Sequence, residues 1–276
     1  MLKPPFLKLL LLINILVDYV YKINCLRKTM KKIIIAGPCS VESKKQIEEI
    51  SYFLNKKNIK YLRGGCFKPR TDPKSFQGLR ELGVELLYNS AKKNNQKTVT
   101  EVLSTDQLKN NYEKIDVIQI GSRNMTNFEL LKEVGKLTKK DKKQILLKRG
   151  FSSTISEFLK AGKYIEQFGN KNIWYCLRGI RTFEQIDSDQ KFTSDLSSIL
   201  ELKKHHKKVL FDPSHSTGNS RYVIDVSKAA LLLGADGLII EVHNNPKVAR
   251  SDKDQQLTFK EFERLLKEIT DLCKLD

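Results

Sequence analysis

Lys and Arg recur in this 276-residue sequence directly after short apolar runs that are typical of buried strands. Arg63, Lys148 and Arg178 follow three of these runs at once, and Arg123 and Lys68 lie a few residues beyond two others. A cation at such a position needs an anion or a carboxylate nearby, because an unpaired buried charge is costly. The pattern therefore predicts a site for a substrate with several negative charges, such as phosphate together with carboxylate.

A second set of residues has the chemistry of metal ligands. Cys39, His215, Glu241 and Asp252 combine soft and hard donors, and such a mixture suits a divalent transition metal such as Mn²⁺, Fe²⁺, Co²⁺ or Zn²⁺. Taken alone, His215 would be a hydrogen-bonded structural histidine and Cys39 a small buried apolar residue. Spacing leaves a choice for the thiol ligand, because Cys39 and Cys66 both follow predicted strands that are adjacent in the sequence.

The segments that must position these residues alternate along the chain. Short β-branched runs, apolar on both faces as in a parallel sheet, predict strands over residues 33–36, 60–63, 98–101, 117–120, 145–148, 173–176, 209–212 and 238–242. Amphipathic stretches predict helices over residues 44–56, 76–94, 105–111, 127–136, 155–167, 197–206, 224–233 and 257–272. Eight such pairs predict a (β/α)8 TIM barrel, in which active sites lie at the C-terminal ends of the strands. The alternative is a doubly wound open sheet, but the glycine-rich nucleotide-binding turns that would favour it are absent from the sequence.

The strongly basic composition raises the question of a nucleic-acid partner. The formal net charge is +18 and the isoelectric point is near 9.6. The basic residues are mostly lysines spread along the chain, without a stripe of interleaved aromatic residues, so we predict a solvated surface and no nucleic-acid binding. Five scattered cysteines do not form a disulfide framework, which favours a reducing, cytoplasmic location.

The first thirty residues differ from the rest. Residues 6–17 are almost continuously apolar, but Asp18 interrupts the run early and the run is short for a membrane span. Met30 offers a second start that leads directly into the first predicted strand. We expect residues 1–30 to be an extension that does not insert stably in a membrane, and residues 31–276 to form a single catalytic barrel that is soluble and active when it starts at Met30.

Several long motifs, in order, give the sequence a specific resemblance. They are AGPCSVES (36–43), LRGGCFKPRT (62–71), SFQGL (75–79), IQIGSRN (118–124), LLKRGF (146–151), CLRGIRTF (176–183), DPSHSTG (212–218) and EVH followed by SDKDQQL (241–257). From about Ile33 to Leu272 the chain resembles the 3-deoxy-7-phosphoheptulonate synthases (DAHP synthases), type I-beta branch, in a compact form without a regulatory domain.

The resemblance implies an activity and a set of residue roles. These enzymes condense phosphoenolpyruvate, erythrose 4-phosphate and water to a seven-carbon sugar acid phosphate and inorganic phosphate, the first step of the shikimate pathway to chorismate and the aromatic amino acids. By residue-to-residue correspondence, phosphoenolpyruvate would contact Arg63, Lys68, Arg123, Lys148 and Arg178. Erythrose 4-phosphate would contact Lys68, Pro69, Arg70, Thr71, Asp212 and Ser214. The catalytic residues would be Lys68, Glu101, Asp212 and His215, and the metal ligands Cys39, His215, Glu241 and Asp252. For the thiol ligand, the Gly-Pro-Cys-Ser motif favours Cys39 over Cys66.

The resemblance also has departures. Leu177 stands where many relatives have Glu, and Asp72 stands where Ser is more common. No regulatory domain is visible, so we expect no inhibition of the isolated chain by Phe, Tyr or Trp. A homo-oligomer, a dimer or a tetramer, is expected, and a separate chorismate mutase is a candidate regulatory partner.

Three other functions compete with this one. The first is 3-deoxyoctulosonate 8-phosphate synthase, which shares the barrel and uses arabinose 5-phosphate. The segment from Lys68 to Thr71 favours the four-carbon acceptor, because the rival family has a different loop there. The second is a binder of nucleic acid or membrane surfaces, which would need clustered basic residues. The third is a decayed scaffold, which the presence of every expected ligand type disfavours.

Overall fold

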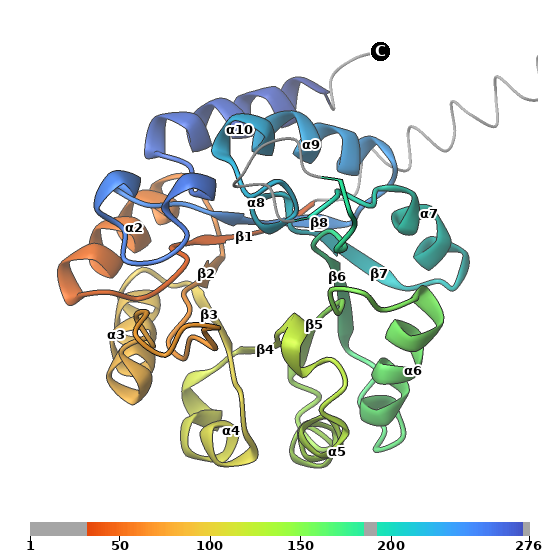
Figure 1. Cartoon of the computed structure of the whole chain (residues 1–276). Helices are drawn as coiled ribbons and strands as arrows, with labels where there is room; N and C mark the ends of the chain where they lie inside the picture. The colour runs from red at the N-terminus through yellow and green to blue at the C-terminus, as the bar shows by residue number, and fades with distance from the viewer. Residues whose placement is uncertain (1–31, 185–191, 273–276) are drawn as a thin grey trace, which may run out of the picture.

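The predicted (β/α)8 barrel is confirmed by a computed structural model that describes residues 32–184 and 192–272. Eight parallel strands pair in chain order and close between β8 and β1, with helices around the outside (Figure 1). The strands are β1 Ile33–Gly37, β2 Tyr61–Arg63, β3 Lys97–Glu101, β4 Val117–Ile120, β5 Gln144–Lys148, β6 Ile173–Leu177, β7 Lys208–Phe211 and β8 Gly237–Glu241.

The helices follow the strands as predicted, with differences at some ends. They are α2 Lys44–Lys56, α3 Arg80–Lys93, α4 Thr105–Asn111, α5 Phe128–Leu137, α6 Ile155–Glu166, α7 Ser197–Lys204, α9 Ser220–Leu232 and α10 Phe259–Leu272. Local signals set several of their N-termini: the Ser43 side chain caps α2, and Thr154 with Glu157 forms a capping box on α6.

Three local predictions were wrong. Helix α3 begins at Arg80 and not at residue 76, because Gly78 adopts a left-handed conformation (φ +89°) and packs against the Cys66 carbonyl. Leu257 is not helical, since it pairs with Val242 as an extension of the sheet. Helix α9 begins at Ser220 and not at residue 224, and the Asp-Pro-Ser-His segment before it forms the short helix α8, Pro213–Thr217, capped by the side chain of Asp212.

The hydrophobic core has two layers, divided by the alternation of side chains along each strand. One layer lies between the strands and the helices. The other fills the inside of the barrel with Ile35, Val99, Val117, Leu146, Trp174, Cys176, Leu210 and Ile239. Leu177 belongs to the outer layer, so its side chain points away from the barrel interior. The replacement of Glu by Leu at this position therefore does not remove a charge from the mouth of the barrel.

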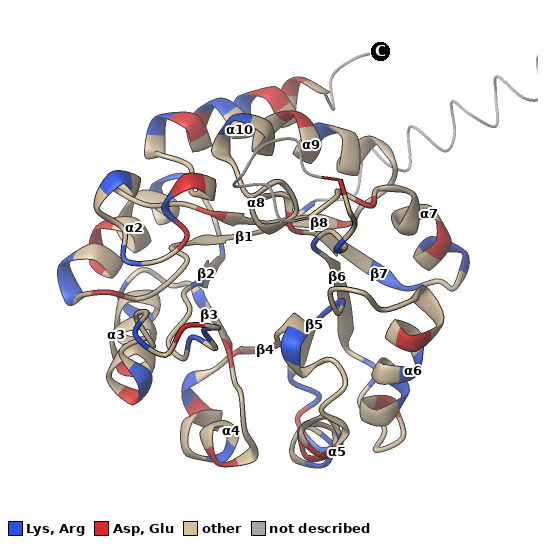
Figure 2. Ribbon diagram, in the orientation of Figure 1, with Lys and Arg blue, Asp and Glu red and all other residues tan. Residues whose placement is uncertain are grey.

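The surface charge agrees with the sequence interpretation. Lys and Arg are scattered over the outer helices and recur at the ends of β2, β5 and β6 (Figure 2). No helix among the described residues is long and apolar enough to cross a membrane. The extension predicted for residues 1–30 lies outside the described residues.

Candidate active site

A simple periodicity places the functional side chains inside the mouth of the barrel. On each strand, the residue two positions after an inward apolar side chain also points inward. At the C-terminal ends these second residues are mostly charged or polar: Arg63, Glu101, Gln119, Lys148, Arg178, Asp212 and Glu241. The first strand ends in Gly37, where a Cβ atom would lie 1.9 Å from the Arg63 carbonyl oxygen. On this strand the inward position after Ile35 is Gly37, which has no side chain. The first polar side chain beyond it is that of Cys39.

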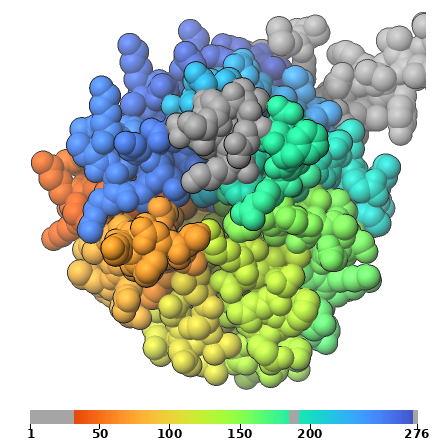
Figure 3. Space-filling model, in the orientation of Figure 1, coloured from red at the N-terminus to blue at the C-terminus, as the bar shows by residue number. Residues whose placement is uncertain are grey.

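These residues surround a cavity of about 640 Å³ at the C-terminal face. The wall includes the predicted residues Arg63, Lys68, Pro69, Arg70, Thr71, Glu101, Arg123, Lys148, Arg178, His215 and Asp252. In Figure 3 the segment between β2 and α3, coloured orange, lies on the face turned to the viewer. This segment carries Lys68 to Thr71 and forms one side of the cavity.

Asp212 lies behind the cavity wall and contacts two residues of that wall, Lys148 and His215. It is fully buried and accepts hydrogen bonds from Lys148 Nζ (2.5 Å) and from the backbone nitrogen of His215 (3.0 Å). Its Oδ2 atom also lies 2.8 Å from His215 Nδ1. Burial alone would raise the pKa of Asp212, but His215 and Lys148 hold it well below the ordinary value of 3.8. Asp212 is thus ionised at neutral pH, and it fixes the orientation of both His215 and Lys148.

We expect Asp212→Asn to destabilise the protein most at neutral pH. The substitution leaves Lys148 as a buried cation without its partner, which typically costs about 3–5 kcal/mol. A depressed folded-state pKa contributes stability that is present above the unfolded value and is lost as the pH falls below it. The difference in Tm between wild type and Asp212→Asn should therefore shrink as the pH falls from about 5 to about 2, toward the folded-state pKa that lies well below 3.8. A difference that stays constant over this range would contradict the assignment.

The Cys39 thiol and the Asp252 carboxylate meet beside Lys68. Cys39 Sγ lies 3.1 Å from Asp252 Oδ2 and 2.9 Å from Lys68 Nζ. Burial would lower the pKa of Lys68, but Cys39 and Asp252 raise it. Burial would likewise raise the pKa of Asp252, yet Lys68 and His215 lower it. Lys68 is therefore a protonated donor and Asp252 an ionised acceptor.

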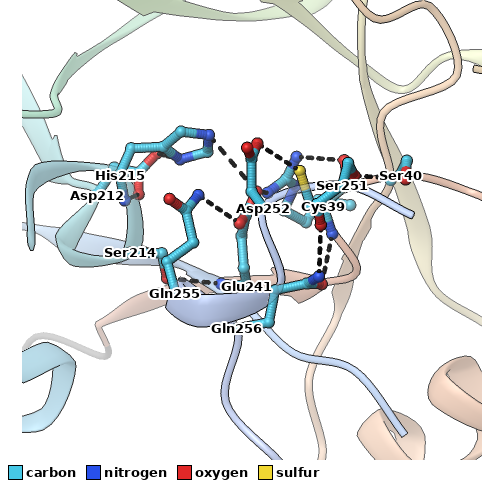
Figure 4. A network of polar contacts seen from close by, with 12 residues as sticks. Cys39, Ser40, Asp212, Ser214, His215, Glu241, Ser251, Asp252, Gln255 and Gln256 are labelled. Atoms are coloured by element: carbon cyan, nitrogen blue, oxygen red, sulfur yellow. Dashed lines mark hydrogen bonds and ion pairs between the residues drawn. The ribbon is translucent and has the colours of Figure 1, made fainter. Parts of the chain in front are cut away.

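Glu241 links this cluster to His215. Its carboxylate accepts from Arg63, and its Oε1 atom lies 3.5 Å from His215 Nε2. Gln255 Nε2 donates to the other oxygen at 2.6 Å. Burial would raise the pKa of Glu241, but His215 and Arg63 lower it. Figure 4 shows Cys39, His215, Glu241 and Asp252 as neighbours in one polar network.

The four predicted metal ligands are thus brought together, and their chemistry fits a divalent transition metal. His215 turns Nε2 toward Glu241 while Nδ1 faces Asp212, the carboxylate–histidine arrangement that commonly orients a metal-binding imidazole. In this structure the four side chains contact one another and the cations Lys68 and Arg63. Accordingly, no three His, Cys, Asp or Glu groups within the described ranges are already spaced around a common point for an ion. Burial also raises the pKa of the Cys39 thiol, so ion binding would have to displace its proton.

Arg178 is a buried cation that forms no ion pair with a carboxylate within residues 32–184 and 192–272. Its guanidinium lies over the Phe192 ring at 3.8 Å and over the Phe151 ring at 5.1 Å. Its NH1 atom is buried and has no hydrogen-bond partner in the part of the chain that the structure describes. Burial lowers its pKa from 12.5 to about 10. A buried charge held in this way is prepared for an anionic ligand.

Some predicted residues lie behind the cavity wall and not on it. Cys39, Asp212, Ser214 and Glu241 are fully buried and contact wall residues. Ser214 Oγ accepts the backbone N–H of Glu241 (2.9 Å). Asp72, the other departure noted in the sequence, lines the cavity.

Sequence reasoning missed other residues of the wall. They include Gln119, Phe151, Arg181 and Gln255. The strand periodicity could have identified Gln119, which follows Val117 by two positions. Phe151 and Arg181 lie in motifs that had already been quoted.

The barrel and its site define an enzyme that binds polyanionic substrates beside a thiol–imidazole–carboxylate donor set. Residues 27–275 match the sequence profile of the DAHP synthetase I family, and the chain belongs to that family.

Two relatives with known names are similar to this chain over most of its length. A phospho-2-dehydro-3-deoxyheptonate aldolase of Thermotoga maritima is 47% identical over 241 residues, which cover 87% of this chain and 69% of that protein. A 2-dehydro-3-deoxyphosphooctonate aldolase of Fusobacterium nucleatum is 28% identical over 264 residues, covering 88% of this chain and 91% of the relative.

Solved structures give the same result. The crystal structure of the Thermotoga maritima DAHP synthase has a TM-score of 0.83 and 44% identity, covering 89% of this chain and 70% of that chain. A truncated form of the Thermotoga maritima enzyme has a TM-score of 0.79 and 42% identity, covering 89% of this chain and 88% of that chain.

Proposed function

We propose that this chain condenses phosphoenolpyruvate with erythrose 4-phosphate and water, giving 3-deoxy-D-arabino-heptulosonate 7-phosphate and inorganic phosphate. The observation that carries the proposal is the single cavity lined by Arg63, Lys68, Arg123, Lys148 and Arg178, beside the donor set around Cys39. A substrate pair that bears two phosphates and a carboxylate matches this charge. In this reaction the vinyl carbon of phosphoenolpyruvate bonds to the aldehyde carbon, water adds at the carbon that bears phosphate, and phosphate leaves.

The described residues divide this work. Lys148 and Arg178, which project inward from the ends of β5 and β6, neutralise phosphoenolpyruvate and then the departing phosphate. Lys68 is protonated and donates a hydrogen bond toward the aldehyde oxygen as charge develops there. Glu101 lies on the cavity wall, where Gln119 donates to it at 3.3 Å. Asp212 and Ser214 act through His215, Lys148 and Glu241, which they hold in place.

A divalent ion fits the donor set of Cys39, His215, Glu241 and Asp252, and when bound it supplies Lewis acidity toward the aldehyde carbonyl. The remaining predictions are a cytoplasmic location, a dimer or tetramer, and regulation by a separate chorismate mutase.

The acceptor aldehyde tests the proposal. We expect kcat/KM for erythrose 4-phosphate to exceed that for arabinose 5-phosphate by about tenfold or more, since a pocket rejects extra or missing groups by roughly this amount. The physical reason is that the segment from Lys68 to Thr71 lines the cavity and is held in place there. The backbone nitrogen of Lys68 donates to Gln77 O (3.0 Å), and Arg70 lies 3.6 Å from Asp252. Phosphate release with each aldose phosphate gives the measurement, and an equal or reversed preference would favour the alternative function, 3-deoxyoctulosonate 8-phosphate synthase.

A further inference from the structure

The donor set depends on two loops that are far apart in the sequence. Cys39 follows β1, and Asp252 lies in the segment between β8 and α10. Asp252 is also held in a left-handed backbone conformation (φ +43°, ψ +48°), which is unfavourable for a residue with a Cβ atom. Neighbouring contacts must therefore keep this carboxylate beside the thiol.

One buried side chain joins the two loops. Gln256 is 2% exposed, and its Oε1 atom accepts the backbone N–H of Cys39 at 2.9 Å. Its Nε2 atom donates to the backbone oxygen of Ser251 at 3.0 Å. These two peptide groups directly precede Cys39 and Asp252. Gln256 thus holds the backbone from which both donors project (Figure 4), and within the described residues its side chain bonds to backbone groups rather than to either donor side chain.

The backbone next to Gln256 is also held by hydrogen bonds. Its neighbour Leu257 pairs with Val242, donating to Glu241 O at 2.8 Å and accepting from the backbone nitrogen of His243 at 2.9 Å. A hydrogen bond of 2.6 Å between the hydroxyls of Ser40 and Ser251 joins the same loops a second time. The amide of Gln256 therefore spans the gap between two loops from an anchored backbone.

We propose that Gln256 is a positioning residue that sets the separation of Cys39 and Asp252 for a divalent cation. The inference rests on the proposed metal site. The amide is suited to this task because one group both accepts and donates, so it can satisfy two peptide groups that point in opposite senses. An apolar side chain of similar size would fill the space and leave both peptide groups unpaired.

The test uses the full chain, stripped of metal and titrated with Co²⁺ alone. Calorimetry gives the Kd, and thiolate-to-Co²⁺ charge-transfer absorption reports the Cys39 ligand. Gln256→Met should weaken Co²⁺ binding about 10- to 100-fold, the usual effect of removing an outer contact of a metal ligand. It should also reduce the absorption per bound ion.

A matched control exists at the other end of the barrel. Gln96 is also buried; it accepts from Ser51 Oγ at 2.7 Å and donates to Ile59 O at 2.9 Å, just before β3. Gln96→Met should lower Tm but leave the Co²⁺ Kd and the absorption within about twofold of wild type. A purely structural role for Gln256 would give the same result in both variants.

The outcomes separate the inference from the metal site. Wild-type Kd and absorption in Gln256→Met would overturn the positioning role. If that variant does not fold, Gln256→Asn decides in its place, because its amide is one methylene too short to reach both peptide groups. It should weaken binding, and wild-type values would overturn the role equally. If wild type and Cys39→Ala show the same weak Co²⁺ spectrum, the metal site itself is wrong.

Discussion

Cys39→Ala is expected to abolish both metal binding and activity, whereas Cys66→Ala should keep most of both. Cys39 Sγ lies among Lys68 and Asp252 in the donor set. The Cys66 thiol is buried, donates weakly to Gly64 O at 3.6 Å and is absent from the cavity wall. Burial raises the pKa of both thiols, so the contacts of Cys39 with Lys68 and Asp252 are what distinguish it from Cys66. We expect the loss for Cys39→Ala to exceed about 100-fold, because outer contacts alone change affinity by 10- to 100-fold.

Elemental analysis of metal content, together with rates in added Mn²⁺, measures the difference between the two cysteines. The two variants remove the same atom from two buried sites, so each controls for the other. If Cys66→Ala loses the metal while Cys39→Ala retains it, the ligand assignment is wrong, although the barrel and the reaction could survive.

Arg178→Met should have opposite effects on binding and on stability. The KM for phosphoenolpyruvate should rise by about 100-fold or more, as expected from losing two hydrogen bonds from a charged group. Tm in the absence of substrate should nevertheless increase by about 2–6 °C, because a buried cation with an unpartnered NH1 atom is removed. Methionine fills a similar volume.

The sign of this stability effect follows from the pKa of Arg178. A folded-state value lowered from 12.5 to about 10 means that the folded protein disfavours the charged form. Burying the charged guanidinium lowers the free energy of unfolding by on the order of 3 kcal/mol. This loss is fully present at pH 7 and decreases only as the pH rises above 10. Lost cation–π contacts with Phe192 and Phe151 offset part of it. Differential scanning calorimetry at pH 7 provides the measurement, and a lower Tm in Arg178→Met would contradict this account.

The barrel could be predicted from the sequence because every strand is a short apolar run that is buried on both faces. The predicted and observed strands agree to within one residue at each end. The location of the site followed from the same pattern. A charge two positions beyond an inward apolar residue, as in Leu146 and Lys148, must point into the mouth of the barrel.

Other features depend on contacts between distant segments and could not be predicted. Asp212 was expected to contact the sugar phosphate, but it lies behind the wall because Lys148 and His215 occupy its oxygens. Gln256 carries no charge or motif that would distinguish it from any other glutamine. Its role is visible only when the loop after β1 is brought against the segment before α10.

The proposed reaction is tested most directly by following phosphorus during turnover. The full chain is incubated with phosphoenolpyruvate, erythrose 4-phosphate and Mn²⁺, and the Mn²⁺ is removed before phosphorus NMR. The spectrum should show the signals of phosphoenolpyruvate and erythrose 4-phosphate replaced by equal amounts of inorganic phosphate and one new sugar phosphate. Neither product should form when erythrose 4-phosphate is omitted. Phosphate release at the same rate without the aldehyde, or unchanged substrates when both are present, would contradict the proposed condensation.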